Sequence, residues 1–306
     1  MSTAALIIGY GAFGRALYHA LRAKASLSVA VYLRTPTAEM DCRDADAIYH
    51  DLPAIPVGRF SHVLVAVPSY AVRSTVGALA LRRDGSDPVF ISCAKGIDLE
   101  SGQFPSEMLA DLTGSDRIGA LSGPSFTDEM VAGKRTLVSV ATPDLGMAKD
   151  VARQLSTDNF RLRPTDDVHG LELLSVAKNI IALGAGLIDG LKLGENFRAA
   201  FVAQGVFELA DLLPRLGGNA DTLHSIGGLG DILLTCVSAR SRNYRMGLAI
   251  GSGESAAGIM SEGLNSATSF VRYLERKGVY STYFESVADA IDAPAGIINI
   301  LNNHAA

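Results

Sequence analysis

The first residues of the chain constrain its fold more than any other stretch of the sequence. Residues 4–8 (AALII) form a short apolar run, followed directly by Gly9-Tyr10-Gly11-Ala12-Phe13-Gly14. A helical pattern then continues through Ala16, Leu17, Ala20 and Leu21. A strand, a G-x-G-x-x-G turn and a helix in this order predict the start of a doubly wound sheet.

The three glycines of this turn have different expected tasks. Gly9 permits the tight turn, Gly11 lets a pyrophosphate approach the backbone, and Gly14 lets helix and strand pack closely. The helix that begins at Ala12 and Phe13 offers free N–H groups to the phosphates. The setting favours a dinucleotide-binding turn over a purely structural glycine turn.

A second predicted strand covers Ser28–Leu33 and is followed directly by Arg34. An acid here would bind the ribose 2′-hydroxyl of NAD, whereas an arginine accommodates the 2′-phosphate of NADP. The first acid after this strand is Glu39. The pattern favours NADP(H), and the alternative is that Arg34 is an ordinary solvated loop residue.

Further strand-like runs alternate with helical stretches in the first half of the chain. The runs are His62–Val67, Pro88–Cys93, Arg117–Leu121 and Thr136–Ala141. They predict an α/β Rossmann domain, with a doubly wound, mostly parallel sheet, over residues 1–166. Ligands bind at the carboxyl ends of such strands, where the sequence places Pro68, Lys95, Gly123 and Ser125. Taken alone, Lys95 would more often be a surface lysine in a turn.

The second half, residues 167–306, has long helical patterns and is predicted to be an all-α domain. Its first helix carries Lys178 as the only charge between Glu172 and Asp189. A helix that is apolar on every side is buried, and desolvation lowers the pKa of a lysine toward neutrality. Lys178 is therefore a candidate proton donor or acceptor, unless its side chain reaches the surface.

The stretch GGLGDILLTCVSARSRNYRMG, residues 227–247, holds one acid in an apolar run. We expect this acid, Asp231, to partner Lys178 across a cleft between the two domains. Arg242, together with Ser241 and Asn243, offers hydrogen-bond donors that suit a phosphate dianion. The alternative for Arg242 is an exposed basic start of a helix.

Seven motifs in this order resemble the bacterial type of NAD(P)-dependent glycerol-3-phosphate dehydrogenase family: GYGAFG, VPSYAVR, CAKG, LSGPSF, VAKN, GLGDILLTC and SRN. The resemblance covers nearly the whole chain. It implies reversible reduction of dihydroxyacetone phosphate to sn-glycerol 3-phosphate, which supplies phospholipid synthesis. It also implies a homodimer.

The resemblance also implies the roles of single residues. Lys178 would be the general acid and base, and Lys95 and Asp231 would act with it. Substrate contacts would come from Lys95, Gly123, Ser125, Asn179, Ser241, Arg242 and Asn243. Cofactor contacts would come from Gly9, Gly11, Ala12, Phe13, Gly14, Arg34, Pro68, Lys95, Arg242 and Glu262.

The chain departs from the family pattern at three places. Leu33 replaces an aromatic residue, the segment between Arg34 and Phe60 is shorter, and Gln204 stands where the family has an arginine. The shortened segment borders the adenosine end of the cofactor. The preference for NADP(H) therefore rests on Arg34, and NAD(H) is the alternative.

Composition excludes several other functions. The net charge of −5 argues against a general nucleic-acid partner. The three cysteines form neither a disulfide framework nor a zinc pattern, so no metal site and a cytoplasmic location are expected. No signal peptide is expected from the first residues, and the apolar stretch Gly170–Leu191 contains charges typical of a core helix rather than a membrane span.

Two other functions stay open at this stage. A related two-domain hydroxy-acid reductase would share the Rossmann half and a lysine on a helix, but it would need no phosphate-binding arginine. A non-catalytic, nucleotide-sensing paralogue would bind the cofactor without turnover. The presence of both Lys178 and Asp231 favours catalysis.

Overall fold

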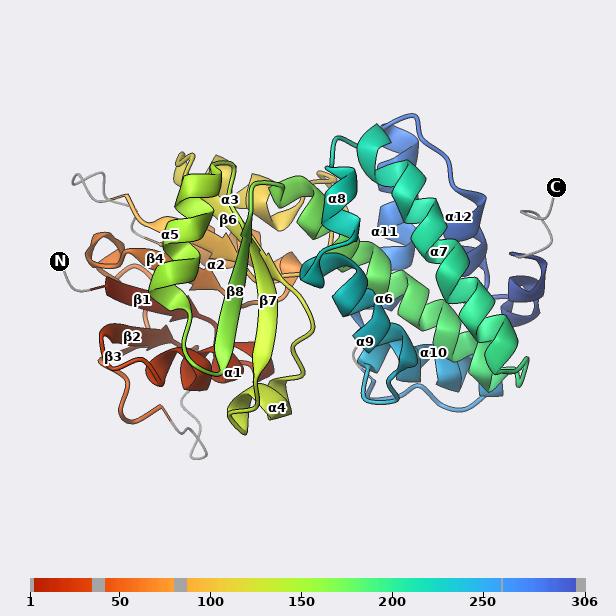
Figure 1. The fold of residues 1–306 in the computed structure, drawn as a ribbon, viewed down its shortest axis with the longest axis horizontal. Coiled ribbons are helices and arrows are strands. Elements are labelled where there is room, and N and C mark those ends of the chain that lie inside the picture. The colour runs from red at the N-terminus through yellow and green to blue at the C-terminus, as the bar shows by residue number, and fades with distance from the viewer. Residues whose placement is uncertain (1–2, 35–41, 80–86, 260, 301–306) are drawn as a thin grey trace. The chain divides into compact units, whose positions relative to one another are not determined.

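The computed structural model describes residues 3–34, 42–79, 87–259 and 261–300, and the chain forms two compact units (Figure 1). The first unit comprises Met1–Lys95 and Gln103–Val168. The second comprises Gly96–Gly102 and His169–Ala306.

The first unit is built on one eight-stranded sheet with the order β3-β2-β1-β4-β5-β6-β7-β8. Its strands are β1 (Thr3–Ile8), β2 (Leu27–Tyr32), β3 (Ala47–Tyr49), β4 (His62–Val65), β5 (Val89–Ser92), β6 (Ile118–Ser122), β7 (Thr136–Ala141) and β8 (Phe160–Thr165). All pairs among these strands are parallel except β6 with β7. Ile8 pairs with Tyr32 on one side and with Val65 on the other. The strand order therefore reverses at β1, and such a switch point is where doubly wound sheets bind ligands.

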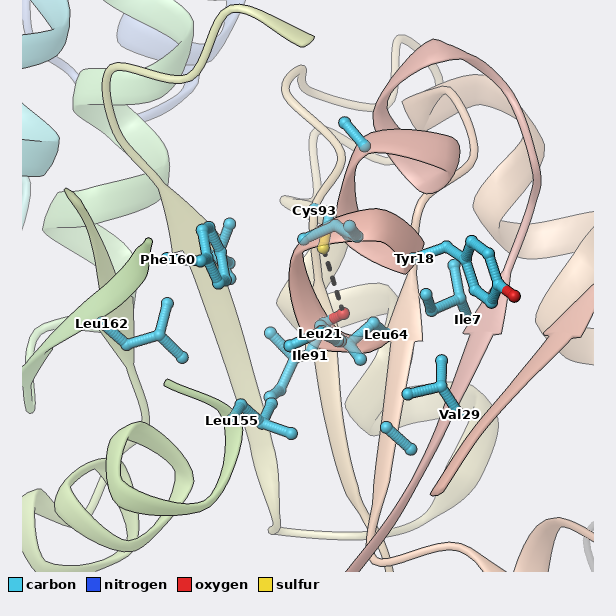
Figure 2. Packing of buried hydrophobic residues seen from close by; sticks show 14 of the residues in the cluster. Ile7, Tyr18, Leu21, Val29, Leu64, Ile91, Cys93, Leu155, Phe160 and Leu162 are labelled. Carbon is cyan, nitrogen blue, oxygen red and sulfur yellow. Dashed lines mark hydrogen bonds between the residues drawn. The ribbon is translucent and has the colours of Figure 1, made fainter. Parts of the chain in front are cut away.

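Helices cover both faces of this sheet. They are α1 (Ala12–Arg22), α2 (Ser69–Gly77), α3 (Pro105–Thr113), α4 (Thr127–Val131) and α5 (Leu145–Leu155), with a short 3₁₀ turn η1 (Val57–Arg59). Because successive side chains of a strand point to opposite faces, the apolar runs supply two separate cores. In one core Ile7 and Leu64 pack with Leu21 and Leu155 (Figure 2). In the other, Leu6 and Val63 pack with residues of α2 and α3, including Val72 and Met108.

The second unit is helical. Its elements are α6 (Val168–Gly190), α7 (Glu195–Arg215), α8 (Ala220–Leu223), η2 (Ile226–Gly230), α9 (Asp231–Val237), α10 (Arg242–Ser252), α11 (Glu262–Arg276), α12 (Thr282–Asp289) and η3 (Pro294–Ile300). Helix α6 is long and apolar enough to cross a membrane, but its apolar window lies wholly inside the structure. The predicted fold class, a Rossmann sheet followed by a helical part, is confirmed.

Helices α6 and α10 touch backbone to backbone through small residues. A Cβ atom at Gly186 would collide with the carbonyl oxygen of Tyr244, and one at Gly247 would collide with that of Leu183. Gly190 and Gly251 repeat the same contact one turn further along their helices. Glycines four residues apart lie on one face of a helix, so each helix presents a flat strip of backbone to the other.

The units differ from the predicted division of the chain in one segment. The sequence places all residues up to 166 in the first domain, whereas Gly96–Gly102 groups with the helical unit. Nη2 of Arg276 donates a hydrogen bond to the carbonyl oxygen of Glu100 at 3.3 Å. The same guanidinium occupies the space that a side chain at Gly102 would need. This contact attaches the segment to α11, and no periodicity in the sequence indicates it.

Candidate active site

The helical unit contains a buried ion pair between Lys178 on α6 and Asp231 at the start of α9. Nζ of Lys178 lies 2.7 Å from Oδ2 of Asp231, and the two side chains are 6% and 2% exposed. Opposite charges that are removed from water this completely persist only when they satisfy each other. The predicted pair therefore forms, but within one unit rather than across a cleft between domains.

A π-helical turn, η2, delivers Asp231 to this position. Oγ of Ser225 accepts a hydrogen bond from the Gly228 N–H at 3.1 Å and begins the turn. A Cβ atom at Gly228 would collide with the carbonyl oxygen of Thr222. The glycine-rich run before Asp231 is thus required by close packing, and π-helical turns often occur at functional sites.

Thr235 is hydrogen-bonded to both residues of the buried pair, and it was not predicted from the sequence. It lies one helical turn after Asp231, and its Oγ1 atom accepts a hydrogen bond from Nζ of Lys178 at 3.1 Å. The same hydroxyl donates to the carbonyl oxygen of Asp231 at 2.6 Å. The i,i+4 spacing of the polar residues in DILLTC was the signal that could have identified it.

Cys236 packs against the backbone of Lys178. Its Sγ atom lies 3.9 Å from the carbonyl oxygen of Lys178, and its side chain is fully buried. Burial raises the pKa of this thiol well above its ordinary value, although the charge of Lys178 acts in the opposite direction. The thiol therefore stays neutral and contributes a dry, apolar wall.

Asn179, Asn243 and Glu262 meet in a hydrogen-bond network. Nδ2 of Asn243 donates to Oδ1 of Asn179 at 2.7 Å, and Nδ2 of Asn179 donates to Oε2 of Glu262 at 3.4 Å. Oδ1 of Asn243 accepts from Oγ of Ser261 at 2.8 Å and from the Gly263 N–H at 2.9 Å. Residues from α6, α10 and α11 are thereby joined through one buried side chain.

Ser241 and Arg242 begin α10 and have different surroundings. Ser241 is buried, and its Oγ atom caps the helix by accepting a hydrogen bond from the Tyr244 N–H at 3.3 Å. Arg242 is exposed, and its guanidinium makes no hydrogen bond or ion pair with the residues that the structure describes. The first turn of α10 holds no acid. A free guanidinium on a helix N-terminus suits an anion with several oxygens.

The glycine turn of the first unit has the geometry that a dinucleotide needs. Gly9 has φ +99°, and a Cβ atom there would lie 2.8 Å from Cγ1 of Val67. At Gly14 a Cβ atom would collide with the carbonyl oxygen of Gly9. At Gly11 a Cβ atom would meet nothing within 4 Å, so this side of the turn faces open space.

The residues of this turn fit a dinucleotide cofactor. Helix α1 begins at Ala12. Its N-cap residue, Gly11, makes no side-chain hydrogen bond to the helix, and the first turn of the helix holds no acid. The N–H groups of Ala12 and Phe13 are consequently available to a pyrophosphate. Arg34 is exposed just beyond the end of β2, where the ribose of such a cofactor would lie. Glu39 lies outside the described residues.

The other predicted residues of this unit also follow strand ends. Pro68 precedes α2 after β4, and Lys95 is half-buried after β5. Gly123 follows β6 and has room only for hydrogen, because a Cβ atom would lie 2.8 Å from Cα of Val138. Oγ of Ser125 donates to the carbonyl oxygen of Gly123 at 2.8 Å. The structure therefore gives Gly123 and Ser125 a role in shaping their own turn.

The sequence also drew attention to Gln204, to the three cysteines and to possible metal ligands. Gln204 is half-buried on α7. Cys42, Cys93 and Cys236 are all buried free thiols. Within the described ranges no group of three histidine, cysteine or acidic side chains is placed to hold a metal ion.

Comparison with known proteins matches both halves of the chain to one family. The model of the NAD-dependent glycerol-3-phosphate dehydrogenase N-terminus matches residues 56–148, and that of the C-terminus matches residues 167–301. A glycerol-3-phosphate dehydrogenase [NAD(P)+] from Sinorhizobium fredii is 34% identical over 303 residues, which cover 94% of this chain and 91% of the relative.

Solved structures agree with this match. The crystal structure of glycerol-3-phosphate dehydrogenase from Coxiella burnetii superposes with a TM-score of 0.84 at 27% identity, covering 98% of this chain and 99% of that one. A 3-hydroxyisobutyrate dehydrogenase from Salmonella typhimurium reaches a TM-score of only 0.52 at 13% identity, covering 97% of this chain and 99% of that one. The second likeness shows a shared fold alone.

Proposed function

The chain belongs to the NAD(P)-dependent glycerol-3-phosphate dehydrogenase family, and on that premise we propose how its residues carry out the reaction. It is an oxidoreductase that interconverts dihydroxyacetone phosphate and sn-glycerol 3-phosphate. The observation that carries the assignment of residues is the buried pair of Lys178 and Asp231. Asn179, the residue after Lys178, accepts a hydrogen bond from Asn243, the residue after Arg242.

NAD(P)H, when bound, supplies the hydride that reduces the C2 carbonyl carbon of dihydroxyacetone phosphate. The chain supplies the proton. Lys178 donates it from Nζ to the C2 oxygen and takes it back in the reverse direction, and such a positioned transfer is worth about 10²–10⁴-fold in rate.

Asp231 and Thr235 keep Lys178 ready for this transfer. Desolvation favours the neutral amine, whereas the adjacent carboxylate favours the ammonium. The Asp231 carboxylate thus opposes the effect of desolvation and favours the protonated form of Lys178. The hydroxyl of Thr235 orients Nζ, because it accepts one of its hydrogen bonds.

Arg242 binds the phosphate of the substrate, and Asn179 and Lys95 place or stabilise the C2 oxygen. Binding of the non-reacting phosphate then orients the reacting carbon. Ser241 supports this site by capping α10, and the α10 N–H groups add to the attraction for an anion. Gly123 and Ser125 line the substrate through the turn that they form.

The cofactor is held by the glycine turn, Pro68 and Glu262, with Lys95 and Arg242 beside it, and we propose a preference for NADP(H). Arg34 supports the preference, because it is exposed at the end of β2 where a 2′-phosphate would need a cation. NAD(H) is the alternative. A location in the cytoplasm, a homodimer and a supply of glycerol 3-phosphate for phospholipid synthesis are part of the same proposal. The three buried free thiols suit a reducing compartment.

A steady-state assay with dihydroxyacetone phosphate, run side by side with NADH and NADPH, tests this function. We expect substrate-dependent oxidation of both, with the higher kcat/KM for NADPH. Turnover of a non-phosphorylated oxo acid alone would instead identify a hydroxy-acid reductase. Cofactor binding with no turnover of either substrate would identify a sensing protein.

A further inference from the structure

The last strand of the sheet in the first unit exposes one of its faces to solvent. Strand β8 lies at the edge of the sheet, beside β7 (Figure 1). Its side chains alternate, so that Phe160 and Leu162 are buried whereas Arg161 and Arg163 are exposed. Because successive side chains of a strand point to opposite faces, the two arginines share the open face.

Strand β7 contributes to the same open face. Leu137 pairs with Arg161 in the parallel register and is 39% exposed, and Ser139 pairs with Arg163. Arg135 is exposed and lies two residues before Leu137, so the period of two places it on this face as well. Three guanidinium groups are therefore carried by neighbouring positions on two paired strands.

A groove with a volume of about 350 Å³ opens on this face. Its lining residues are Arg135, Thr136, Leu137, Asp158, Asn159 and Arg161. The volume lies at the lower end of the range that small-molecule sites occupy. All of these residues belong to the first unit, and none of them has a part in the proposed reaction.

The arginines of this face have little counter-charge within the protein. The guanidinium groups of Arg135 and Arg163 make no hydrogen bond or ion pair with residues in the described ranges. Arg161 lies 3.7 Å from Oδ1 of Asp158, but that carboxylate is fully exposed, so water screens the pair. Like charges on paired strands repel each other. An anion from outside the protein would remove this repulsion.

We propose that this groove binds a small molecule that carries a diphosphate group. Each guanidinium offers a planar fork of donors that matches two phosphate oxygens. The Cα atoms of Arg161 and Arg163 are about 6.6 Å apart along their strand, and Arg135 lies on the neighbouring strand. Two linked phosphate groups can contact arginines at several of these positions at once, whereas a single phosphate is satisfied by fewer. Leu137 provides an apolar floor between the cations.

Isothermal titration calorimetry with pyrophosphate tests this site. The protein is first saturated with NADPH and sn-glycerol 3-phosphate, an unreactive pair that fills the proposed active site, and the ionic strength is held constant. We expect one pyrophosphate to bind per chain. Its Kd should rise at least about 10-fold in Arg135→Ala and in Arg163→Ala, because each loses charge-assisted hydrogen bonds.

Arg59→Ala is the matched control. Arg59 is an exposed arginine of η1 in the same unit, and it likewise makes no hydrogen bond or ion pair with the described part of the chain. Its removal changes the net charge by the same amount but leaves the groove intact. The Kd for pyrophosphate should therefore stay that of wild type.

Thermal unfolding of the same proteins supplies a second readout. Pyrophosphate should raise the Tm of wild type and of Arg59→Ala, but not that of a variant combining Arg135→Ala with Arg163→Ala. Without ligand and at low ionic strength, this double variant should be at least as stable as wild type, because the repulsion between the arginines is removed.

ADP distinguishes the two possible sources of a diphosphate. Tighter binding of pyrophosphate than of ADP would identify a free inorganic diphosphate as the ligand, and the reverse order would identify a nucleotide. If neither binds to wild type, or if the Kd in the groove variants equals that in Arg59→Ala, the proposed site is wrong. The kcat and KM of the double variant for dihydroxyacetone phosphate should match wild type, so either result leaves the proposed function unaffected.

Discussion

Lys178 and Arg242 are each followed by one partner of the same hydrogen bond, the 2.7 Å contact between Asn179 and Asn243. The buried ammonium on α6 and the free guanidinium on α10 are thus connected through their next residues. In the proposed reaction the first acts on the C2 oxygen and the second on the phosphate. The residues proposed to act on the two ends of the substrate therefore lie on two helices, α6 and α10, that pack against each other.

Removing the amine of Lys178 should remove the proton transfer. We expect Lys178→Ala to lower kcat by about 10²–10⁴-fold while the affinity for NADPH stays close to that of wild type. Steady-state kinetics and cofactor fluorescence titration measure the two effects. Lys149→Ala, at an exposed lysine of α5, is the control. Turnover like that of wild type would exclude Lys178 from the mechanism.

The same variant leaves Asp231 buried without its cation, which costs stability. Thermal unfolding must therefore accompany the kinetics, and Lys178→Met combined with Asp231→Leu provides a folded reference. Such a replacement of both charges by apolar groups is often neutral or stabilising. It should be equally inactive, which would separate lost chemistry from lost folding.

Arg242→Ala should chiefly weaken binding of the phosphorylated substrate. A hydrogen bond to a charged group contributes about 1.5–3 kcal/mol, so the KM for dihydroxyacetone phosphate should rise about 10- to 100-fold. Arg245→Ala, at an exposed arginine of the same helix, is the matched control and should leave this KM unchanged. Equal damage to phosphorylated and non-phosphorylated substrates would contradict the phosphate assignment.

Thr235→Val removes the hydroxyl that accepts from Nζ of Lys178 but keeps the size of the side chain. An unsatisfied donor in a buried site costs about 1–3 kcal/mol, so the free energy of unfolding should fall by that amount. The kcat should fall as well, because Nζ loses an orienting partner. Thr235→Ser restores the hydroxyl and should recover both quantities. Chemical denaturation and steady-state kinetics provide the measurements, and no rescue by serine would mean that the methyl group matters instead.

Gly11 and Gly14 should respond differently to the same added methyl group. Gly11→Ala meets open space at an ordinary φ of −73°, so the fold should persist while the methyl group obstructs the pyrophosphate. Gly14→Ala collides with the backbone of Gly9 and should destabilise the first unit. Cofactor titration and thermal unfolding distinguish the two results. Unchanged cofactor affinity in Gly11→Ala would place the pyrophosphate elsewhere.

His62 should make stability depend on pH below neutrality. Its side chain is 2% exposed, its Nδ1 atom has no hydrogen-bond partner among the described residues, and burial lowers its pKa to about 4, with Arg117 adding to the effect. The unfolded chain binds a proton near the ordinary pKa of 6.5, whereas the folded protein does not until about 4. The unfolded state therefore gains protons first, and stability falls as the pH is lowered through this window.

The size of this effect is bounded by the pKa difference and is at most roughly 3 kcal/mol. His62→Leu should remove it, so the variant should lose less stability than wild type between about pH 7 and about pH 4. Urea denaturation at several pH values measures the difference. Parallel curves for the two proteins would show that His62 does not titrate between the folded and unfolded states.

The sequence predicted those parts of the fold that have a local cause. The β1 turn needs glycines for contacts within a few residues, and the run around Lys178 is apolar on every side, so both features are visible in the letters alone. The short strand β3 (Ala47–Tyr49) was missed because three residues in a polar stretch carry no periodicity. The attachment of Gly96–Gly102 to α11 depends on Arg276, which is distant in the sequence.

The candidate site was predictable as a set of residue types but not as a network. The pairing of Lys178 with Asp231 followed from two isolated charges that each needed a partner. Thr235 and the inward use of Asn243 could not follow, because a hydroxyl or an amide has many possible partners and only packing selects among them. Polar residues without a charge therefore carry less information in a sequence than buried charges do.

The glycine contact between α6 and α10 fixes the distance between the axes of these two helices. Where backbones touch, no rotamer change can widen or narrow the separation of the helices. The separation between the backbones of Lys178, the proposed proton donor, and Arg242, the proposed phosphate-binding residue, is then set by main-chain geometry. In the proposed site, a substrate with one more carbon between its carbonyl and its phosphate would have to be accommodated by the Arg242 side chain alone, because the two helices cannot move apart or closer together.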